Sequence, residues 1–101
     1  MEIIFTPAML EYMKKKNKYN ISVEIASSDH SDFDVSELYI RLVSDAFADQ
    51  MLKMKKSHEI RTPQGRVLLP NYRLDYDETV IFDRKKLFWK IDRTTVEGIR
   101  L

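Results

Sequence analysis

The sequence predicts an α+β fold, a small mixed or antiparallel β structure with two helices packed on its outside. Three observations lead to this expectation. Segments that alternate apolar and polar residues recur along the chain, as in half-buried strands. Two other segments place apolar residues three and four positions apart, as in helices that cover a core. The 101 residues include only two glycines and three prolines, so we expect no linker and a single domain over residues 1–101.

A strand followed by a capped helix is expected first. The mainly apolar run Glu2–Phe5 predicts the strand. The hydroxyl of Thr6 can accept a hydrogen bond from a free N–H of the first helical turn. Pro7 suits the first helical position, because its missing N–H costs nothing there. Consecutive lysines then predict a helix end at about Lys16, since cations are favoured at the carbonyl end of the helix dipole.

Two strands and a second helix are expected next. Asn20–Ala26 and Glu37–Val43 each carry aliphatic residues at alternate positions, which predicts an antiparallel pair. The polar segment Ser27–Val35 is expected to connect them as a loop. Ser44–Lys56 predicts the second helix, because Ser44 can cap it and apolar residues follow at helical spacing.

The remainder of the chain is predicted to be rich in strands. A Pro-x-Gly turn joins the first two, since proline fixes φ and glycine can adopt positive φ. Asp83–Lys86 is expected to form a turn further along. The predicted strands are His58–Arg61, Arg66–Leu69, Tyr72–Tyr76, Thr79–Phe82, Leu87–Asp92 and Val96–Leu101.

Composition argues against several classes of function. The formal net charge is +1, from 17 basic and 16 acidic residues, so no overall field favours nucleic acid or an anionic membrane surface. The chain has no cysteine, which excludes disulfides, thiolate metal sites and thiol nucleophiles. The sequence suggests neither a secretory signal nor an apolar run long enough to span a bilayer. We therefore expect a cytoplasmic protein that does not bind membranes.

The sequence offers little for catalysis or cofactor binding. Gly65 and Gly98 lie far apart, so a glycine-rich phosphate loop cannot form. The two histidines, His30 and His58, are accompanied by no G-x-S-x-G turn. We therefore expect a non-catalytic protein without a cofactor, and an enzyme is the third alternative.

An acidic loop is the candidate metal site. Four potential ligands fall close together: Asp29, His30, Asp32 and Asp34. The calcium-loop pattern of EF-hands fails, because Glu37 stands where that pattern needs glycine and Val43 stands where it needs glutamate. The other interpretation is a solvated connection whose Asp and Ser residues form local turns.

Two further binding interpretations concern the second half. Arg84–Lys86 precedes Phe88 and Trp89, a combination that nucleic-acid binders use for phosphate contact and stacking. The nearly balanced charge argues against a nucleic-acid partner. Aromatic residues here can line a ligand pocket, although clustered aromatics more often form a core. These residues are Tyr72, Tyr76, Phe82, Phe88 and Trp89.

Three stretches carry a family resemblance. They are Ile3–Ala8, His58–Ile60 together with Gly65–Pro70, and Val96–Ile99. In this order they resemble the first strand and capped helix, the turn glycine with its hydrophobic strand, and the closing strand of the HesB-like domain. This domain is the fold of A-type iron–sulfur cluster carriers. The likeness is strongest to the family's shorter bacterial variants, which have a paired-cysteine or selenocysteine loop.

The resemblance implies a small mixed β structure with helices outside it, and also a departure in chemistry. The family binds its cluster through cysteines, one of them in a loop after an early strand and others nearer the C-terminus. The corresponding loop here is Ser27–Ser31, and the chain contains no cysteine. No functional residue can be carried over, because thiolates hold the irons of such clusters.

We therefore expect a non-catalytic binding or assembly module on a HesB-like scaffold that cannot carry an iron–sulfur cluster through thiolates. Its partner would be another protein or a second copy of the chain, since exposed sheet edges need covering. The alternative is a binder of a small ligand or divalent ion that uses the acidic loop Ser27–Glu37.

Overall fold

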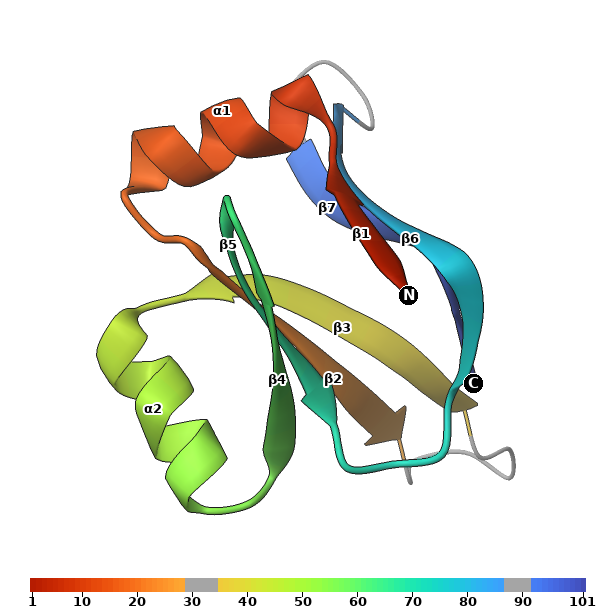
Figure 1. Cartoon of the computed structure of the whole chain (residues 1–101). Coiled ribbons are helices and arrows are strands. Elements are labelled where there is room, and N and C mark those ends of the chain that lie inside the picture. The colour runs from red at the N-terminus through yellow and green to blue at the C-terminus, as the bar shows by residue number, and fades with distance from the viewer. Residues whose placement is uncertain (29–34, 87–91) are drawn as a thin grey trace.

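The computed structural model describes residues 1–28, 35–86 and 92–101 (Figure 1). This part of the chain forms two helices and seven strands, which confirms the predicted α+β class. Their bounds are β1 (Glu2–Phe5), α1 (Pro7–Lys16), β2 (Asn20–Ser28), β3 (Val35–Val43), α2 (Asp45–Lys53), β4 (Ser57–Thr62), β5 (Gly65–Pro70), β6 (Asp75–Lys86) and β7 (Asp92–Arg100).

The strands form two sheets. The three-stranded sheet has the order β1-β6-β7, with β1 parallel and β7 antiparallel to β6. The four-stranded sheet has the order β3-β2-β5-β4, in which only β2 and β5 are parallel. Both sheets are thus mixed, and over the two sheets together most neighbouring strands are antiparallel, as predicted.

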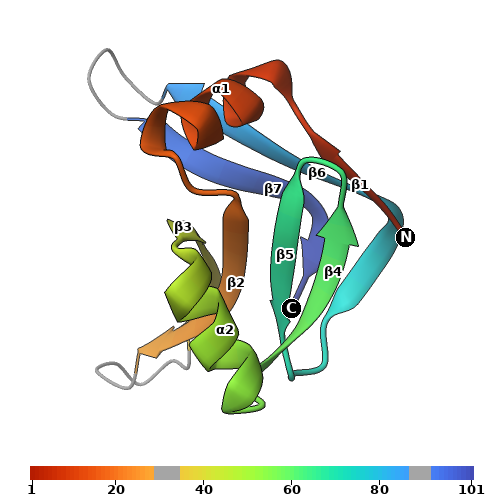
Figure 2. The same cartoon turned by 60° about the vertical axis from the view of Figure 1, so that its left-hand side comes forward.

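The main core lies between the two sheets, and the helices pack outside them (Figures 1 and 2). Helix α1 covers one end of this core through Met9 and Met13, which are fully buried beside Phe82 of β6. Helix α2 packs on the outer face of the four-stranded sheet, where Ala48 contacts Leu68 of β5. Strand β5 is therefore buried on both faces, which explains its continuous apolar sequence.

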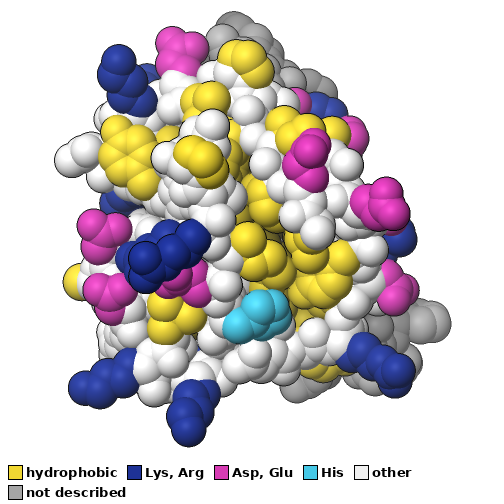
Figure 3. Space-filling model, viewed as in Figure 1, with side chains coloured by type: hydrophobic (Ala, Val, Ile, Leu, Met, Phe, Trp, Pro, Cys, Tyr) yellow, Lys and Arg dark blue, Asp and Glu magenta, His cyan; other side chains and the backbone are white. Residues whose placement is uncertain are grey.

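Hydrophobic side chains also gather on one face of the molecule. In Figure 3 they occupy the centre of the view, and charged side chains surround them. Figure 1, drawn from the same side, shows that this region lies between β4 and β1. Both are edge strands of their sheets.

Capping residues and left-handed residues determine where the two helices begin and end. The Thr6 hydroxyl accepts a hydrogen bond from the backbone N–H of Met9 at 3.2 Å, and Asn17 ends α1 in the left-handed conformation with φ 53°. The Ser44 hydroxyl accepts from the N–H of Phe47 at 3.2 Å. Helix α2 ends at Lys53, earlier than the predicted Lys56, because Lys55 adopts a φ of 58° that a helix cannot continue.

The second half corrects several predicted boundaries. The predicted strands Tyr72–Tyr76 and Thr79–Phe82 and the predicted turn Asp83–Lys86 were wrong as separate elements. Asp75 to Lys86 form the single strand β6, and its last four residues pair with the first four of β7. This pairing overrides the turn preference of the charged residues. Of the predicted strand Leu87–Asp92, only Asp92 is described, and it begins β7.

No helix in residues 1–28, 35–86 or 92–101 is long and apolar enough to cross a membrane.

Candidate functional site

The four predicted metal ligands lie outside the described residues: Asp29, His30, Asp32 and Asp34. The predicted loop Ser27–Val35 is too long, because Ser27 and Ser28 pair with Ser36 and Val35 and so extend β2 and β3. Among the residues the structure describes, no three His, Asp or Glu side chains lie close enough to hold a metal ion. His58 is exposed on β4, and its Nδ1 lies 3.2 Å from Oδ1 of Asn71.

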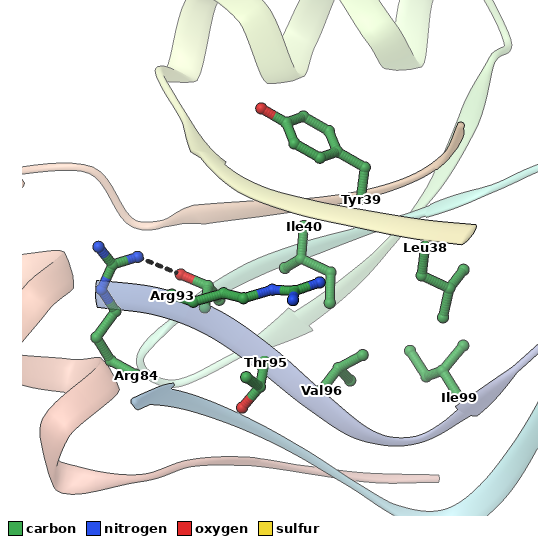
Figure 4. A pocket seen from close by; sticks show the side chains of 9 residues that line it. Leu38, Tyr39, Ile40, Arg84, Arg93, Thr95, Val96 and Ile99 are labelled. Carbon is green, nitrogen blue, oxygen red and sulfur yellow. Dashed lines mark hydrogen bonds between the residues drawn. The ribbon is translucent and has the colours of Figure 1, made fainter. Parts of the chain in front are cut away.

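A groove of about 570 Å³ runs between β3 and β7, the facing edge strands of the two sheets. The strands approach to within 8 Å between Cα atoms but do not pair. Leu38 and Ile40 of β3 point toward Val96 and Ile99 of β7 (Figure 4). The groove therefore has an apolar wall on both sides.

The wall contributed by β7 depends on an irregularity at Gly98. In a regular strand Val96 and Ile99 would point to opposite faces, because side chains alternate. Gly98 adopts a φ of 93°, which shifts the alternation as a bulge does, and both side chains face β3 (Figure 4). A Cβ at position 98 would lie 2.4 Å from the carbonyl oxygen of Thr79, so only glycine fits without movement.

Arg84 of β6 lies at one end of the groove. Its guanidinium carbon is 3.8 Å from the centre of the Tyr12 ring of α1, and its Nη1 donates a hydrogen bond to the Thr94 hydroxyl at 2.9 Å. These two contacts fix the plane of the guanidinium. Its Nε is buried without a hydrogen-bond partner among the described residues. The fold thus holds a positive charge in place with donor capacity that these contacts do not use.

Further cations surround this end of the groove. A second hollow of about 360 Å³ shares Arg84 with the first and is also lined by Lys16 and Lys18. Nζ of Lys16 lies 6.0 Å from the centre of the Tyr12 ring. Arg93 extends into the space between the two strands (Figure 4). Within the part of the chain that the structure describes, no aspartate or glutamate lines either hollow.

Two other arginines are already neutralised by carboxylates. Arg41 borders the second hollow, but its Nε donates to Glu24 at 2.8 Å, and this hydrogen bond raises the pKa of Arg41. Arg66 donates to Asp49 at 2.9 Å and to the buried Asn20 at 2.7 Å, and the bond to Asp49 raises its pKa. These arginines join elements of the four-stranded sheet and α2, so their role is structural.

The aromatic residues singled out in the sequence separate into three groups. Phe82 is fully buried in the main core and Tyr76 packs against it, as the core interpretation predicts. Tyr72 is 64% exposed. Phe88 and Trp89 lie outside the described residues.

Sequence reasoning missed the residues that form the groove. Tyr12, Arg84 and Thr94 come from a helix and two strands, and only the pairing of β6 with β7 and the packing of α1 on β6 bring them together. Arg84 was assigned to a turn, where a cation is ordinarily solvated. The basic and aromatic pattern of residues 84–89 marked Arg84 as a candidate phosphate contact, but it did not indicate the groove or its other residues.

Comparison of this chain with protein-family models, with curated proteins and with solved structures finds no match. The HesB-like resemblance stays a prediction.

Proposed function

We propose that this chain is a non-catalytic binding module and that the groove between β3 and β7 is its binding surface. One observation carries the proposal: a groove of about 570 Å³, with apolar side chains from both strands and polar ones beside them, ends on an arginine held in a fixed orientation. Small-molecule sites usually have volumes of about 300–1,000 Å³, apolar walls and a few convergent polar groups. The groove has these properties.

The lining favours binding over catalysis. Activating a hydroxyl nucleophile requires an adjacent base such as histidine or a carboxylate. Thr94 and Thr95 bring hydroxyl groups to the groove, but its described lining contains neither type of base. The arginines can bind and orient an anion, and they do not act as general bases because they remain protonated.

The scaffold and location belong to the same proposal. We propose a HesB-like scaffold that binds a ligand without a cluster, which the observed strand, capped helix and mixed sheets support. The proposed location is the cytoplasm, which suits a chain without cysteine.

Binding of a neutral fluorescent probe, N-phenyl-1-naphthylamine, tests whether the groove binds apolar molecules at all. We expect its emission to rise with the wild-type protein and to fall strongly in Val96→Phe, which fills the groove. Ile4→Phe is the matched control, because Ile4 is a 38% exposed apolar residue on β1 outside the groove. Equal emission from both folded variants would show that the probe binds elsewhere and would contradict the proposal.

Self-association is the second candidate function, and the hydrophobic region between edge strands β4 and β1 favours it (Figure 3). A two-fold partner would cover that region and both edges. Sedimentation at micromolar concentration should then show a dimer, whereas a monomer at all concentrations would exclude it.

The acidic-loop alternative also stays a prediction. Millimolar calcium or magnesium should raise the melting temperature if Ser27–Glu37 binds an ion, since a ligand that binds only the native state stabilises it. An unchanged melting temperature would exclude this site.

A further inference from the structure

We propose that the groove between β3 and β7 binds a small amphipathic anion, with one phosphate or carboxylate head group at Arg84 and an unbranched apolar chain along the strands. This inference rests on the proposed function and adds the chemical class of the ligand. The chain would lie on the side chains that form the two apolar walls: Leu38, Ile40, Val96 and Ile99.

The head-group position follows from the contacts of Arg84. A guanidinium carries five N–H donors, and among the described residues it makes the one hydrogen bond to Thr94. The Tyr12 ring on one of its faces keeps it in a single orientation. A planar fork of donors in a fixed orientation suits the oxygens of a phosphate or carboxylate, which can accept two hydrogen bonds at once.

The positive side chains around Arg84 favour an anionic ligand. Lys16, Lys18 and Arg93 line the same two hollows as Arg84, and no carboxylate of the described residues does. The whole chain carries a formal charge of only +1, so this grouping of cations is a local feature. Lys16 and Arg84 both lie near the Tyr12 ring. An anion between these cations would reduce their mutual repulsion.

The apolar walls set the length of the rest of the ligand. Figure 4 shows Arg84 and Leu38 at opposite ends of the groove, with Ile40 and Val96 between them. The three residue steps from Val96 to Ile99 span at most roughly 10 Å. A saturated chain of about eight carbons is of similar length and would cover this wall by hydrophobic contact.

The spacing of the two strands favours a small molecule over an extended peptide. A peptide strand inserted between β3 and β7 needs two strand spacings, about 9.5 Å in total. The Cα atoms of β3 and β7 come within 8 Å of each other, so a strand does not fit between them there. An alkyl chain is narrower than a peptide strand, so it does not need this distance between β3 and β7.

A ligand series tests the inference. Isothermal titration calorimetry is run with n-octyl phosphate, n-octanoate, n-octanol and inorganic phosphate. We expect octyl phosphate and octanoate to bind at least about tenfold more tightly than octanol or inorganic phosphate, because only they satisfy both the arginine and the walls. Added salt should weaken binding of the two anions and leave octanol unaffected.

One variant and a matched control test whether the head group contacts Arg84. Arg84→Gln should weaken octyl phosphate binding about tenfold or more and leave octanol binding unchanged. Arg73→Gln is the matched control, because Arg73 is exposed and lines neither hollow. Amide shifts of the wild-type protein give a measurement that does not depend on variant folding. Octyl phosphate should shift the signals of Thr94, Val96 and Ile40.

Three results would overturn the inference. Octanol could bind as tightly as octyl phosphate, Arg84→Gln could retain full affinity, or anionic vesicles could bind while monomeric octyl phosphate does not. If the neutral probe still binds at Val96 in any of these cases, the proposed function stands and only the ligand class is wrong. If neither neutral nor charged ligands perturb β3 and β7, the proposed function fails as well.

Discussion

Replacing Gly98 with alanine tests whether the irregularity in β7 builds the groove. The backbone φ of 93° is strained for a residue with a side chain, at a cost of about 1–3 kcal/mol. The new Cβ would also lie 2.4 Å from the Thr79 carbonyl oxygen and 3.3 Å from the Val80 Cα. Both are backbone atoms, so β7 must move away from β6. We expect the free energy of unfolding to fall by about 2–4 kcal/mol in total.

Urea unfolding followed by circular dichroism measures this loss. With a denaturant slope of about 1–3 kcal/mol per molar, a loss near 3 kcal/mol lowers the midpoint by about 1.5 M. Glu97→Ala is the control on the same strand, because Glu97 is exposed, and its effect should stay within about 0.5 kcal/mol. Gly98→Ala should also weaken octyl phosphate binding, since Ile99 would leave the wall. An unchanged midpoint for Gly98→Ala would refute the assignment of strain to this position.

Three further substitutions test other parts of the fold. Tyr76→Phe should raise the free energy of unfolding by about 0.5–1.5 kcal/mol, because the buried Tyr76 hydroxyl has no partner among the described residues. Burial also raises the pKa of Tyr76. The wild type should therefore lose stability as the pH rises above about 10, and Tyr76→Phe should lose less. A less stable variant would contradict the first expectation, and an equal alkaline loss in both proteins would contradict the second. Asn20→Ala should cost about 2 kcal/mol in urea unfolding, because it removes the acceptor for Arg66 Nε, and a neutral effect would show that the network around Arg66 is not stabilising. Hydrogen bonds from Arg61 and then Arg66 lower the pKa of Glu59, so its contribution is present above the ordinary value of about 4.3 and is lost as the pH falls through the lowered one. Glu59→Gln should accordingly flatten the acid side of the stability profile, and an identical profile would exclude this ion pair.

The sequence predicted those parts of the fold that local chemistry determines. Thr6 and Pro7 mark the start of α1 for reasons that lie within one helical turn. The Thr6 hydroxyl accepts a hydrogen bond from a free backbone N–H, and Pro7 lacks an N–H at a position where it would have no helical partner. The alternation in Asn20–Ala26 predicts β2 because one face of that strand is buried. The same reasoning failed at Asp83–Lys86, where charged residues resemble a turn. That segment is a strand because it pairs with Asp92–Thr95.

The groove could not be predicted because its parts are joined only by tertiary contacts. Arg84 is fixed by Tyr12 of a distant helix and by Thr94 across a strand pair. Glycine at position 98 predicts conformational freedom, but only its φ of 93° in the folded chain shows that this freedom is used to turn Ile99 toward β3. A sequence pattern contains no information about the tertiary contacts at Arg84 or at Gly98.

Intermolecular nuclear Overhauser effects between octyl phosphate and the methyl-labelled protein test the central claim most directly. We predict contacts from the terminal methyl of the ligand to Leu38 and Ile99, and from its middle methylenes to Ile40 and Val96. The methylene beside the phosphate should contact the Tyr12 ring. Contacts confined to the outer face of α2, or a chain that runs with its phosphate at Leu38, would contradict a groove that binds an amphipathic anion at Arg84.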